Sequence, residues 1–116
     1  MISNAEIRPW GMFENMYTNN DDTIKVKKII VNPHSRLSLQ SHDCRSEIWF
    51  CSEGEGLYQL EDTIYTMTRG MPIFIPINIK HRIINNSDNP LVIIEIQTGN
   101  ILTEEDIVRY EDDYNR

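Results

Sequence analysis

The chain has 116 residues, of which 40% are hydrophobic and 25% charged, a composition that favours one globular domain over residues 1–116. Its formal net charge is -7, and such an acidic chain repels phosphate backbones, which argues against a nucleic-acid partner. A small anionic ligand is still compatible with this charge, because a local basic cluster dominates within a Debye length of about 8 Å.

The cysteines and the N-terminus indicate a cytoplasmic location. Cys44 and Cys51 do not show the spacing of a disulfide framework or a zinc ribbon. Met1 to Trp10 contains no basic segment followed by an apolar run, so no signal peptide is expected. The apolar runs are far shorter than a membrane span. We therefore expect a cytoplasmic protein with reduced thiols and no membrane partner.

Short β-rich runs separated by turn residues follow one another along most of the chain. Turns are indicated by Asn32-Pro33, by Gly54 and Gly56, and by the run from Ser87 to Pro90. Since no helical periodicity lies between the runs, they predict an all-β antiparallel sandwich or barrel. In chain order the expected strands are Ile24–Asn32, Arg36–Gln40, Ser46–Cys51, Gly56–Glu61, Thr63–Met67, Pro72–Ile75, Arg82–Asn85 and Leu91–Thr98.

One short helix is predicted near the C-terminus. Thr103 followed by Asp106 resembles a capping box, although Asp is weaker than Glu at the second position. The segment beyond it, Ile107–Arg116, is expected to form this helix or a tail.

Four side chains form a candidate metal-ligand set: Gln40, His42, Glu47 and His81. Gln40 and His42 are two apart in an expected strand, so they point to the same face. Two imidazoles, a carboxylate and an amide oxygen suit a first-row divalent ion. Each residue alone has a simpler explanation, because a lone strand histidine is usually structural and a lone glutamate usually solvated. The spacing of the four therefore carries the prediction.

That spacing resembles the first sequence motif of the cupin family. Glu47 is followed, after six residues, by Gly54, as in the end of that motif. Gln40 stands in the place of the motif's first histidine, and His34 in the place of its opening glycine.

The second cupin motif is matched as well. Only Asn78 departs from it, replacing a glycine, and Asn tolerates positive φ better than most residues. The resemblance implies a cupin fold, that is, a double-stranded β-helix or jelly-roll sandwich. The matching positions are Gly70, Pro76, Asn78, His81 and Asn85.

A closer resemblance covers nearly the whole chain and concerns the isomerase domain of type II phosphomannose isomerases. It implies one divalent ion (Zn, Co, Mn or Ni) on Gln40, His42, Glu47 and His81, and interconversion of mannose 6-phosphate and fructose 6-phosphate. In that family a guanylyltransferase domain usually precedes, and no Gly-rich nucleotide-binding loop precedes here, so a stand-alone domain is expected. The similar runs begin at Arg8, Lys25, Leu37, Arg45, Ile75, His81 and Asp106.

Asp43 and Cys44 depart from the family, whose members commonly carry histidines after the position of His42. If those histidines assist the reaction, this chain could lack activity. Cys44 could also be a weak extra ligand, although a buried inert thiol is the more ordinary interpretation.

Roles for basic residues follow partly from the resemblance. It implies that Arg45 is a catalytic arginine whose fixed charge stabilises a developing oxyanion. The alternative for Arg45 is a surface salt bridge. Lys80 and Arg82 flank His81 and are candidates for binding the substrate's phosphate, or else solvated strand ends.

Glu95 is a candidate proton-transfer base or partner of the metal ligands, if the strand face that it shares with Gln97 lines the barrel. The alternative places Glu95 towards solvent and buries Val92, Ile94 and Ile96. Four aromatic residues are expected in the core or the pocket wall, namely Trp49, Tyr58, Phe50 and Phe74.

Three functions compete on this evidence: an isomerase of phosphorylated sugars, a non-catalytic sugar-binding or regulatory cupin, and another metal enzyme such as a dioxygenase. The fold alone cannot choose among them. We further expect a homodimer paired through sheet edges, with Arg8–Phe13 and its Trp10 as the crossing element.

Overall fold

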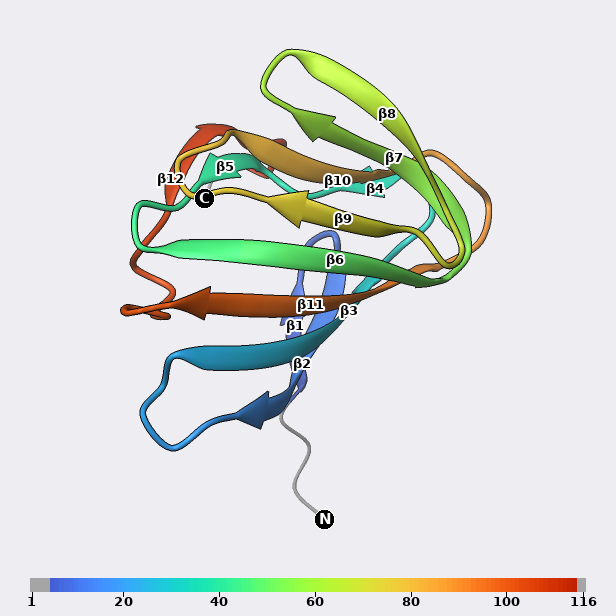
Figure 1. Cartoon of the computed structure of the whole chain (residues 1–116). Coiled ribbons are helices and arrows are strands. Elements are labelled where there is room, and N and C mark those ends of the chain that lie inside the picture. Colours follow the sequence, from blue (N-terminus) through green and yellow to red (C-terminus); the bar gives the residue numbers. More distant parts are fainter. Residues whose placement is uncertain (1–4, 115–116) are drawn as a thin grey trace.

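The computed structural model describes residues 5–114, which form two antiparallel sheets facing each other (Figure 1). One sheet has the strand order β1-β2-β3-β11-β6-β9, and the other has the order β12-β5-β10-β7-β8, with β4 paired to β10. The strands are β1 Ala5–Arg8, β2 Gly11–Thr18, β3 Ile24–Val31, β4 Ser35–Arg36, β5 Leu39–Ser41, β6 Arg45–Glu53, β7 Glu55–Leu60, β8 Thr63–Thr68, β9 Pro72–Ile75, β10 His81–Asn85, β11 Leu91–Gly99 and β12 Val108–Glu111.

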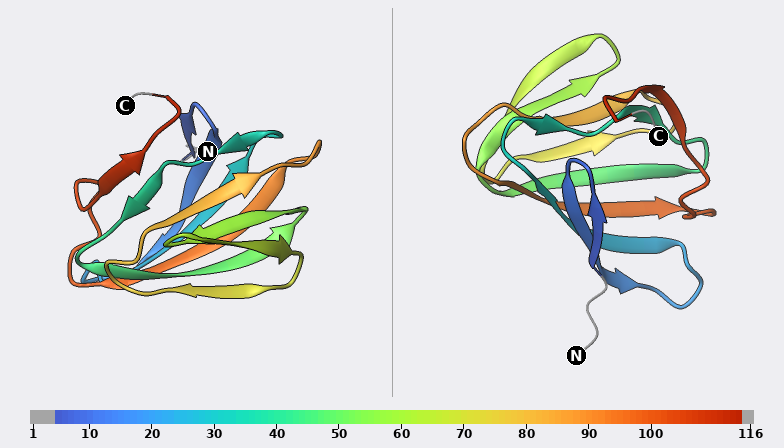
Figure 2. Two further views of the ribbon diagram at one scale, coloured as in Figure 1. Left: turned by 90° about the horizontal axis from the view of Figure 1, so that it is seen from above. Right: turned by 180° about the vertical axis from the view of Figure 1, so that it is seen from behind.

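The predicted all-β cupin fold is confirmed, and every expected strand is present within a few residues. The expected run Arg36–Gln40 divides into β4 and β5, which both pair with β10. The β1–β2 hairpin and β12 were not predicted. Both views in Figure 2 place this hairpin and β12 on the same side of the molecule, behind the face shown in Figure 1.

Alternating burial along the central strands divides the interior into an apolar end and a polar end. On β11, Leu91 and Ile93 point into the apolar core, and Glu95 and Gln97 continue the same inward row. Because side chains alternate along a strand, the inward-facing row of β11 therefore contributes to both the apolar and the polar end of the interior. The neighbouring strands match this division, since Cys51 pairs with Ile93 in register, whereas Glu47 pairs with Gln97. The site is built at the polar end.

Two positions that are glycine in the cupin motifs adopt left-handed backbone conformations here. Asn78 has φ 65° and His34 has φ 54°. Asn and His are among the non-glycine residues most often found in this region, so the fold keeps both turns without glycine. The expectation that Asn78 is a mild replacement agrees with this geometry.

The predicted C-terminal helix is wrong for the described part of the chain, which contains no helix; the last two residues of the expected segment, 115–116, lie outside the described residues. A turn is closed by the Asp106 amide, which donates to Thr103 O at 3.2 Å. The Asp106 carboxylate accepts hydrogen bonds from the backbone amides of Asp43 and Cys44 instead of capping a helix. Val108–Glu111 then pairs with β5 as an edge strand, so its backbone groups form hydrogen bonds within a sheet and not within a helix.

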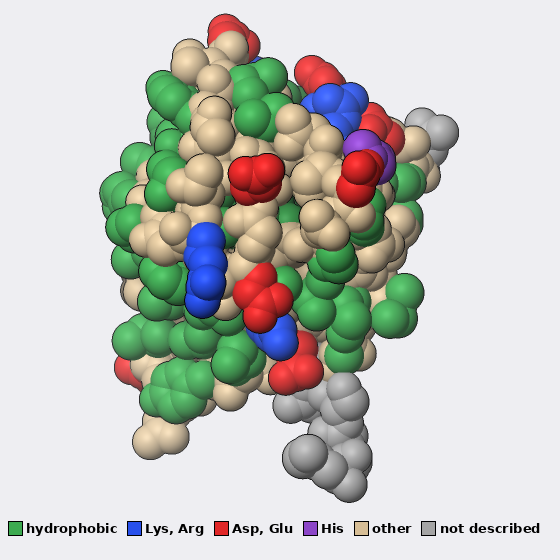
Figure 3. All heavy atoms as spheres, turned by 90° about the vertical axis from the view of Figure 1, so that its right-hand side faces the viewer, with side chains coloured by type: hydrophobic (Ala, Val, Ile, Leu, Met, Phe, Trp, Pro, Cys, Tyr) green, Lys and Arg blue, Asp and Glu red, His purple; other side chains and the backbone are tan. Residues whose placement is uncertain are grey.

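The outer face of the first sheet is more apolar than expected. Phe50 and Phe74, predicted in the core or pocket wall, are 44% and 60% exposed, because they lie on the outward row of β6 and β9. Trp49 is buried as predicted, and Tyr58 packs partly buried against the core. Figure 3 shows apolar side chains gathered along the left edge of the molecule, whereas most of the charged side chains in view lie nearer its middle and upper right. No helix that could cross a bilayer occurs among residues 5–114.

Candidate metal centre

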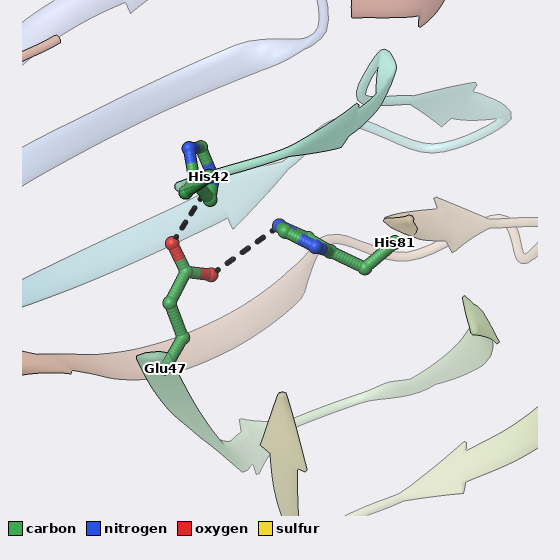
Figure 4. Close-up of side chains that lie close together, drawn as sticks. All are labelled: His42, Glu47 and His81. Carbon is green, nitrogen blue, oxygen red and sulfur yellow. Dashed lines mark ion pairs between the residues drawn. The ribbon is translucent and has the colours of Figure 1, made fainter. Parts of the chain in front are cut away.

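Three predicted metal ligands converge at the polar end of the interior (Figure 4). His42 follows β5, Glu47 lies in β6 and His81 begins β10, so both sheets contribute. Nε2 of His42 is 3.3 Å from Glu47 Oε2, and Nε2 of His81 is 3.6 Å from Glu47 Oε1. One ligand atom from each residue lies within 4.8 Å of the others, and all three residues are buried. This spacing allows one ion to contact all three residues.

Backbone carbonyls orient both imidazoles. Nδ1 of His42 lies 2.6 Å from Asp106 O, and Nδ1 of His81 lies 2.8 Å from Ile79 O. A carbonyl can only accept, so each Nδ1 carries the proton, and each Nε2, which lies near the Glu47 carboxylate, keeps its lone pair. Burial, aided by the positive charge of Arg45, lowers the pKa of His42 to about 4. Burial likewise lowers the pKa of His81. Neutral imidazoles at pH 7 fit a divalent ion.

Gln40 lies beside this group. It is the register partner of His81 in the β5–β10 pair and lines the same cavity as Glu47 and His81. Its side-chain amide donates to Ser38 Oγ at 3.2 Å, which leaves the amide oxygen as the atom available to a metal. This placement is compatible with the predicted fourth ligand.

Arg45 is buried against the same carboxylate, so the surface-salt-bridge interpretation is wrong. It is 6% exposed, and its Nε donates to Glu47 Oε2 at 2.9 Å. Its Nη2 donates to the Nε2 lone pair of His42 at 3.1 Å. Its Nη1 is buried and has no hydrogen-bond partner within the described part of the chain. Nη1 is therefore a buried donor beside the candidate ligands with its hydrogen-bonding capacity unused.

Glu95 faces inward, so the solvent-facing alternative is wrong. It is 6% exposed and lines the cavity with Glu47. The Trp49 indole N–H is shared between Glu95 Oε2 at 3.0 Å and Glu47 Oε1 at 3.1 Å. The Gln97 amide donates to Glu95 Oε1 at 2.6 Å. Burial, and then the charge of Glu47, raise the pKa of Glu95 to about 7. A carboxyl that titrates near neutrality can both accept and return a proton.

The cavity has a buried floor and an exposed rim. Glu47, Glu95 and His81 belong to the floor and are nearly inaccessible to solvent. Arg8 and Arg109 belong to the rim, where Arg8 is half-buried and Arg109 exposed. The cavity thus leads from the surface to the candidate ligands.

Lys80 and Arg82, predicted to bind phosphate, lie differently from each other. Lys80 Nζ lies 4.4 Å from the centroid of the Tyr110 ring and does not line the cavity. Arg82 lines it but is 1% exposed, and its guanidinium is engaged by Leu37 O and by Glu111. Arg82 is therefore not the solvated strand end of the alternative interpretation. Its guanidinium links β12 to the segment after β4 through these hydrogen bonds.

The departures from the family's histidine run lie outside the cavity lining. Asp43 is exposed and Cys44 half-buried, and neither lines the cavity. Cys44 is a free cysteine outside the group of candidate ligands, and it is not the buried thiol of the sequence interpretation. Their backbone amides hold Asp106, which in turn fixes His42.

Lys27 and Asp106 were not identified from sequence as contributors to the site. Lys27 is 4% exposed, lines the cavity and forms an ion pair with Glu104. The alternation Lys27, Ile29, Val31 along one strand face could have indicated its inward direction. The role of Asp106 as a partner of the His42 loop carried no local signal, because the two are 64 residues apart.

A family model described as "Mannose-6-phosphate isomerase C-terminal" matches residues 2–112. The chain belongs to this family. The resemblance to type II phosphomannose isomerases is thereby confirmed at the level of the domain.

Relatives agree with this assignment. The chain is 38% identical over 109 residues to Xanthan biosynthesis protein XanB of Xanthomonas campestris pv. campestris, strain B100, covering 94% of this chain and 23% of that protein. It is 39% identical over 109 residues to Alginate biosynthesis protein AlgA of Pseudomonas aeruginosa, covering 94% of this chain and 22% of the relative. The chain thus spans less than a quarter of the length of these relatives.

Solved structures show the same fold. Capsular polysaccharide assembling protein CapF from Staphylococcus aureus superposes with a TM-score of 0.83 at 19% identity, covering 96% of this chain and 33% of CapF. A protein from Planctomyces limnophilus superposes with a TM-score of 0.71 at 20% identity, covering 92% of this chain and 93% of that chain. At this level of identity the similarity concerns the fold alone.

Proposed function

We propose that this domain is a metal-dependent isomerase that interconverts mannose 6-phosphate and fructose 6-phosphate. The observation that carries the proposal is the floor of the cavity. There the candidate ligands Glu47 and His81 share one buried space with Arg45 and with Glu95, whose pKa lies near 7. The family match supports the substrate class.

Gln40, His42, Glu47 and His81 would hold the ion. A bound divalent ion supplies Lewis-acid polarisation of the sugar's carbonyl and hydroxyl oxygens. The chain prepares the site by keeping both imidazoles neutral through burial and by holding each Nε2 near Glu47. Zinc, cobalt, manganese and nickel are all compatible with this nitrogen and oxygen set.

Glu95 moves the proton in this proposal. In the direction from aldose to ketose, the C2–H bond breaks and the proton passes to the Glu95 carboxylate, while the electron pair forms the C1=C2 bond and leaves negative charge on O1. The O2 proton passes to O1, Glu95 returns its proton to C1, and C2 becomes the carbonyl carbon. No oxidant or co-reactant is needed. The hydrogen bonds from Trp49 and Gln97 fix the carboxylate for both transfers.

Arg45 stabilises the charge that develops on the sugar oxygens. Its Nη1 already lies desolvated without a partner, whereas its Nε is held by Glu47. A preorganised donor of this kind acts mainly on the transition state. We place the reaction in the cytoplasm, where both free cysteines, Cys44 and Cys51, would stay reduced.

A coupled assay for fructose 6-phosphate formed from mannose 6-phosphate tests the proposal on metal-loaded protein. Glu95→Gln keeps the shape of the side chain but cannot carry the proton, so turnover should fall by at least ~100-fold. Glu55→Gln, at an exposed position of β7, is the matched control and should leave turnover unchanged. Absence of fructose 6-phosphate with the wild-type protein loaded with each of the four metals would reject the isomerase.

A non-catalytic sugar-binding cupin is the second candidate. It is favoured by Asp43 and Cys44, which replace the family's histidines. It predicts sugar-phosphate binding without turnover, so the same assay combined with a binding measurement separates the two.

A further inference from the structure

We propose that Arg8 and Arg109 form an anion subsite at the rim of the cavity and bind the phosphate of a phosphorylated sugar. This inference rests on the proposed function, because it places the sugar's reacting end at the metal centre. The subsite is built from β1 and β12, which are one edge strand from each sheet. It differs from the sequence-based assignment to Lys80 and Arg82.

The charge of the cavity favours an anionic guest. The chain as a whole has a formal net charge of -7, yet arginine and lysine outnumber carboxylates in the cavity lining. Two of the basic side chains, Lys27 and Arg82, are already engaged by Glu104 and Glu111. Arg45 is engaged by Glu47 at the floor. The remaining cationic side chains of the lining are those at the rim.

Arg109 is placed to face the substrate. It pairs in register with Gln40 on β5, and paired residues of antiparallel strands point to the same face of the sheet. Gln40 lines the cavity beside Glu47, so the guanidinium extends over the same space. Among residues 5–114, the Arg109 side chain forms no hydrogen bond and no ion pair, so its guanidinium donors are available to a ligand.

Arg8 approaches from the other sheet. Its guanidinium carbon lies 4.9 Å from the centroid of the Phe13 ring, which orients the side chain over the cavity wall. Its ion pair with Glu6 is long, at 3.4 Å, and half-exposed, so an incoming phosphate can replace it. Figure 2 shows the β1–β2 hairpin and β12 on one side of the molecule, and both arginines belong to the lining of the one cavity.

The division of the cavity into floor and rim determines the orientation of the substrate in this proposal. A phosphate is strongly hydrated and binds best to guanidinium groups near solvent, whereas a carbonyl needs the dry floor at Glu47 and Glu95. A hexose phosphorylated at the end opposite to its carbonyl matches this arrangement. An unphosphorylated hexose lacks the group that the rim would bind.

Calorimetric titration of metal-loaded protein tests the subsite with two probes that cannot be isomerised, glucitol 6-phosphate and glucitol. Arg8→Gln and Arg109→Gln should each weaken binding of glucitol 6-phosphate by ~10-fold, the usual effect of losing one charge-assisted hydrogen bond. The double variant should weaken it by roughly 100-fold if the two arginines act independently. Binding of glucitol should stay unchanged. Lys80→Gln is the matched control, because Lys80 lies outside the cavity lining, and it should bind both probes like the wild type.

Unchanged binding of glucitol 6-phosphate in the double variant would overturn the subsite, and so would failure of the wild type to prefer glucitol 6-phosphate over glucitol. A weakening by Lys80→Gln equal to that of the arginine variants would also overturn it. Turnover of mannose 6-phosphate separates the two proposals. Arginine-dependent binding without turnover supports the subsite and rejects the isomerase. Turnover with an unchanged KM in the double variant supports the isomerase and rejects the subsite.

Discussion

His42 and Asp106, 64 residues apart, are joined by a hydrogen bond of 2.6 Å between the imidazole Nδ1 and the backbone carbonyl. The Asp106 carboxylate also accepts hydrogen bonds from the amides of Asp43 and Cys44 at 2.9 Å and 3.0 Å. The segment before β12 therefore fixes the loop that carries a candidate metal ligand. Partners of this kind set the tautomer and the direction of a ligating histidine.

Asp106→Ala should lower metal affinity by ~10–100-fold, the usual cost of removing an outer partner of a metal ligand. The side chain holds the His42 loop through two amides, so its loss frees the loop although the carbonyl remains. Competition with a chelating dye measures the change. Glu105→Ala, the exposed neighbour, is the control. Equal affinity in Asp106→Ala and wild type would show that the loop needs no such support.

We predict one divalent ion per chain, held by Gln40, His42, Glu47 and His81. Elemental analysis of protein purified without chelator should detect it, and the double variant His42→Ala with His81→Ala should abolish it, because both Nε2 donors are lost. His34→Ala, at an exposed histidine paired with Asp88, should keep the metal. Full metal content in the double variant would reject the ligand assignment.

Arg45→Ala should lower turnover by at least ~100-fold, about 3 kcal/mol of transition-state stabilisation. Metal content should not fall, because arginine does not ligate and its Nη2 now occupies the lone pair of His42. Arg45→Lys should restore little, since lysine lacks the planar fork that grips two oxygens. Steady-state kinetics on variants with measured metal content tests this prediction. Equal turnover in Arg45→Ala and wild type would show that Arg45 is only an ion-pair partner of Glu47.

The pH dependence of stability in metal-free protein should distinguish Glu95 from His42. The folded-state pKa of Glu95 is raised to about 7, so its contribution is complete below the unfolded pKa and is lost as pH rises through 7. The folded-state pKa of His42 is lowered to about 4, so its contribution is complete above 6.5 and is lost as pH falls towards 4. As the pH falls from about 7 to about 4, the contribution of Glu95 to stability therefore rises while that of His42 falls, so the two contributions oppose each other.

Replacing Glu95 by Gln should reveal the pH dependence of stability that His42 causes. On acidification from pH 7.5 to 5, Glu95→Gln should lose more stability than the wild type, by roughly 2–3 kcal/mol as the shift of the carboxyl implies. Urea unfolding of chelator-treated wild type and Glu95→Gln at pH 7.5 and at pH 5 measures this difference in stability. Parallel curves for the two proteins would contradict the inward, protonated state of Glu95.

We predict a homodimer paired through the β1 edge. The segment Arg8–Phe13 lies in the β1–β2 hairpin, with Trp10 and Phe13 in the chain's own core, which leaves β1 as the edge of its sheet. Ile7→Lys, at a side chain 76% exposed on that edge, should weaken the dimer, because a charge on an edge strand opposes pairing. Ile64→Lys on β8, an edge of the other sheet, is the control. A monomeric wild type in sedimentation at micromolar concentration would reject the dimer.

Sequence alone determined most of the strands and the candidate metal ligands, because both depend on local patterns. Alternation and turn residues marked β3 and β6 to β11, and motif spacing identified His42, Glu47 and His81. The left-handed backbone at His34 and Asn78 shows that two motif positions kept their geometry after losing glycine.

Only the tertiary structure decided where ambiguous side chains point and which distant segments meet. Glu95 could have faced either side of its strand, since alternation fixes the period and not which face is buried. Its direction follows from the register of β11 with β6, which brings it to Trp49. The predicted terminal helix gave way to β12 because the Asp106 carboxylate binds the His42 loop, a contact between segments that no local propensity encodes.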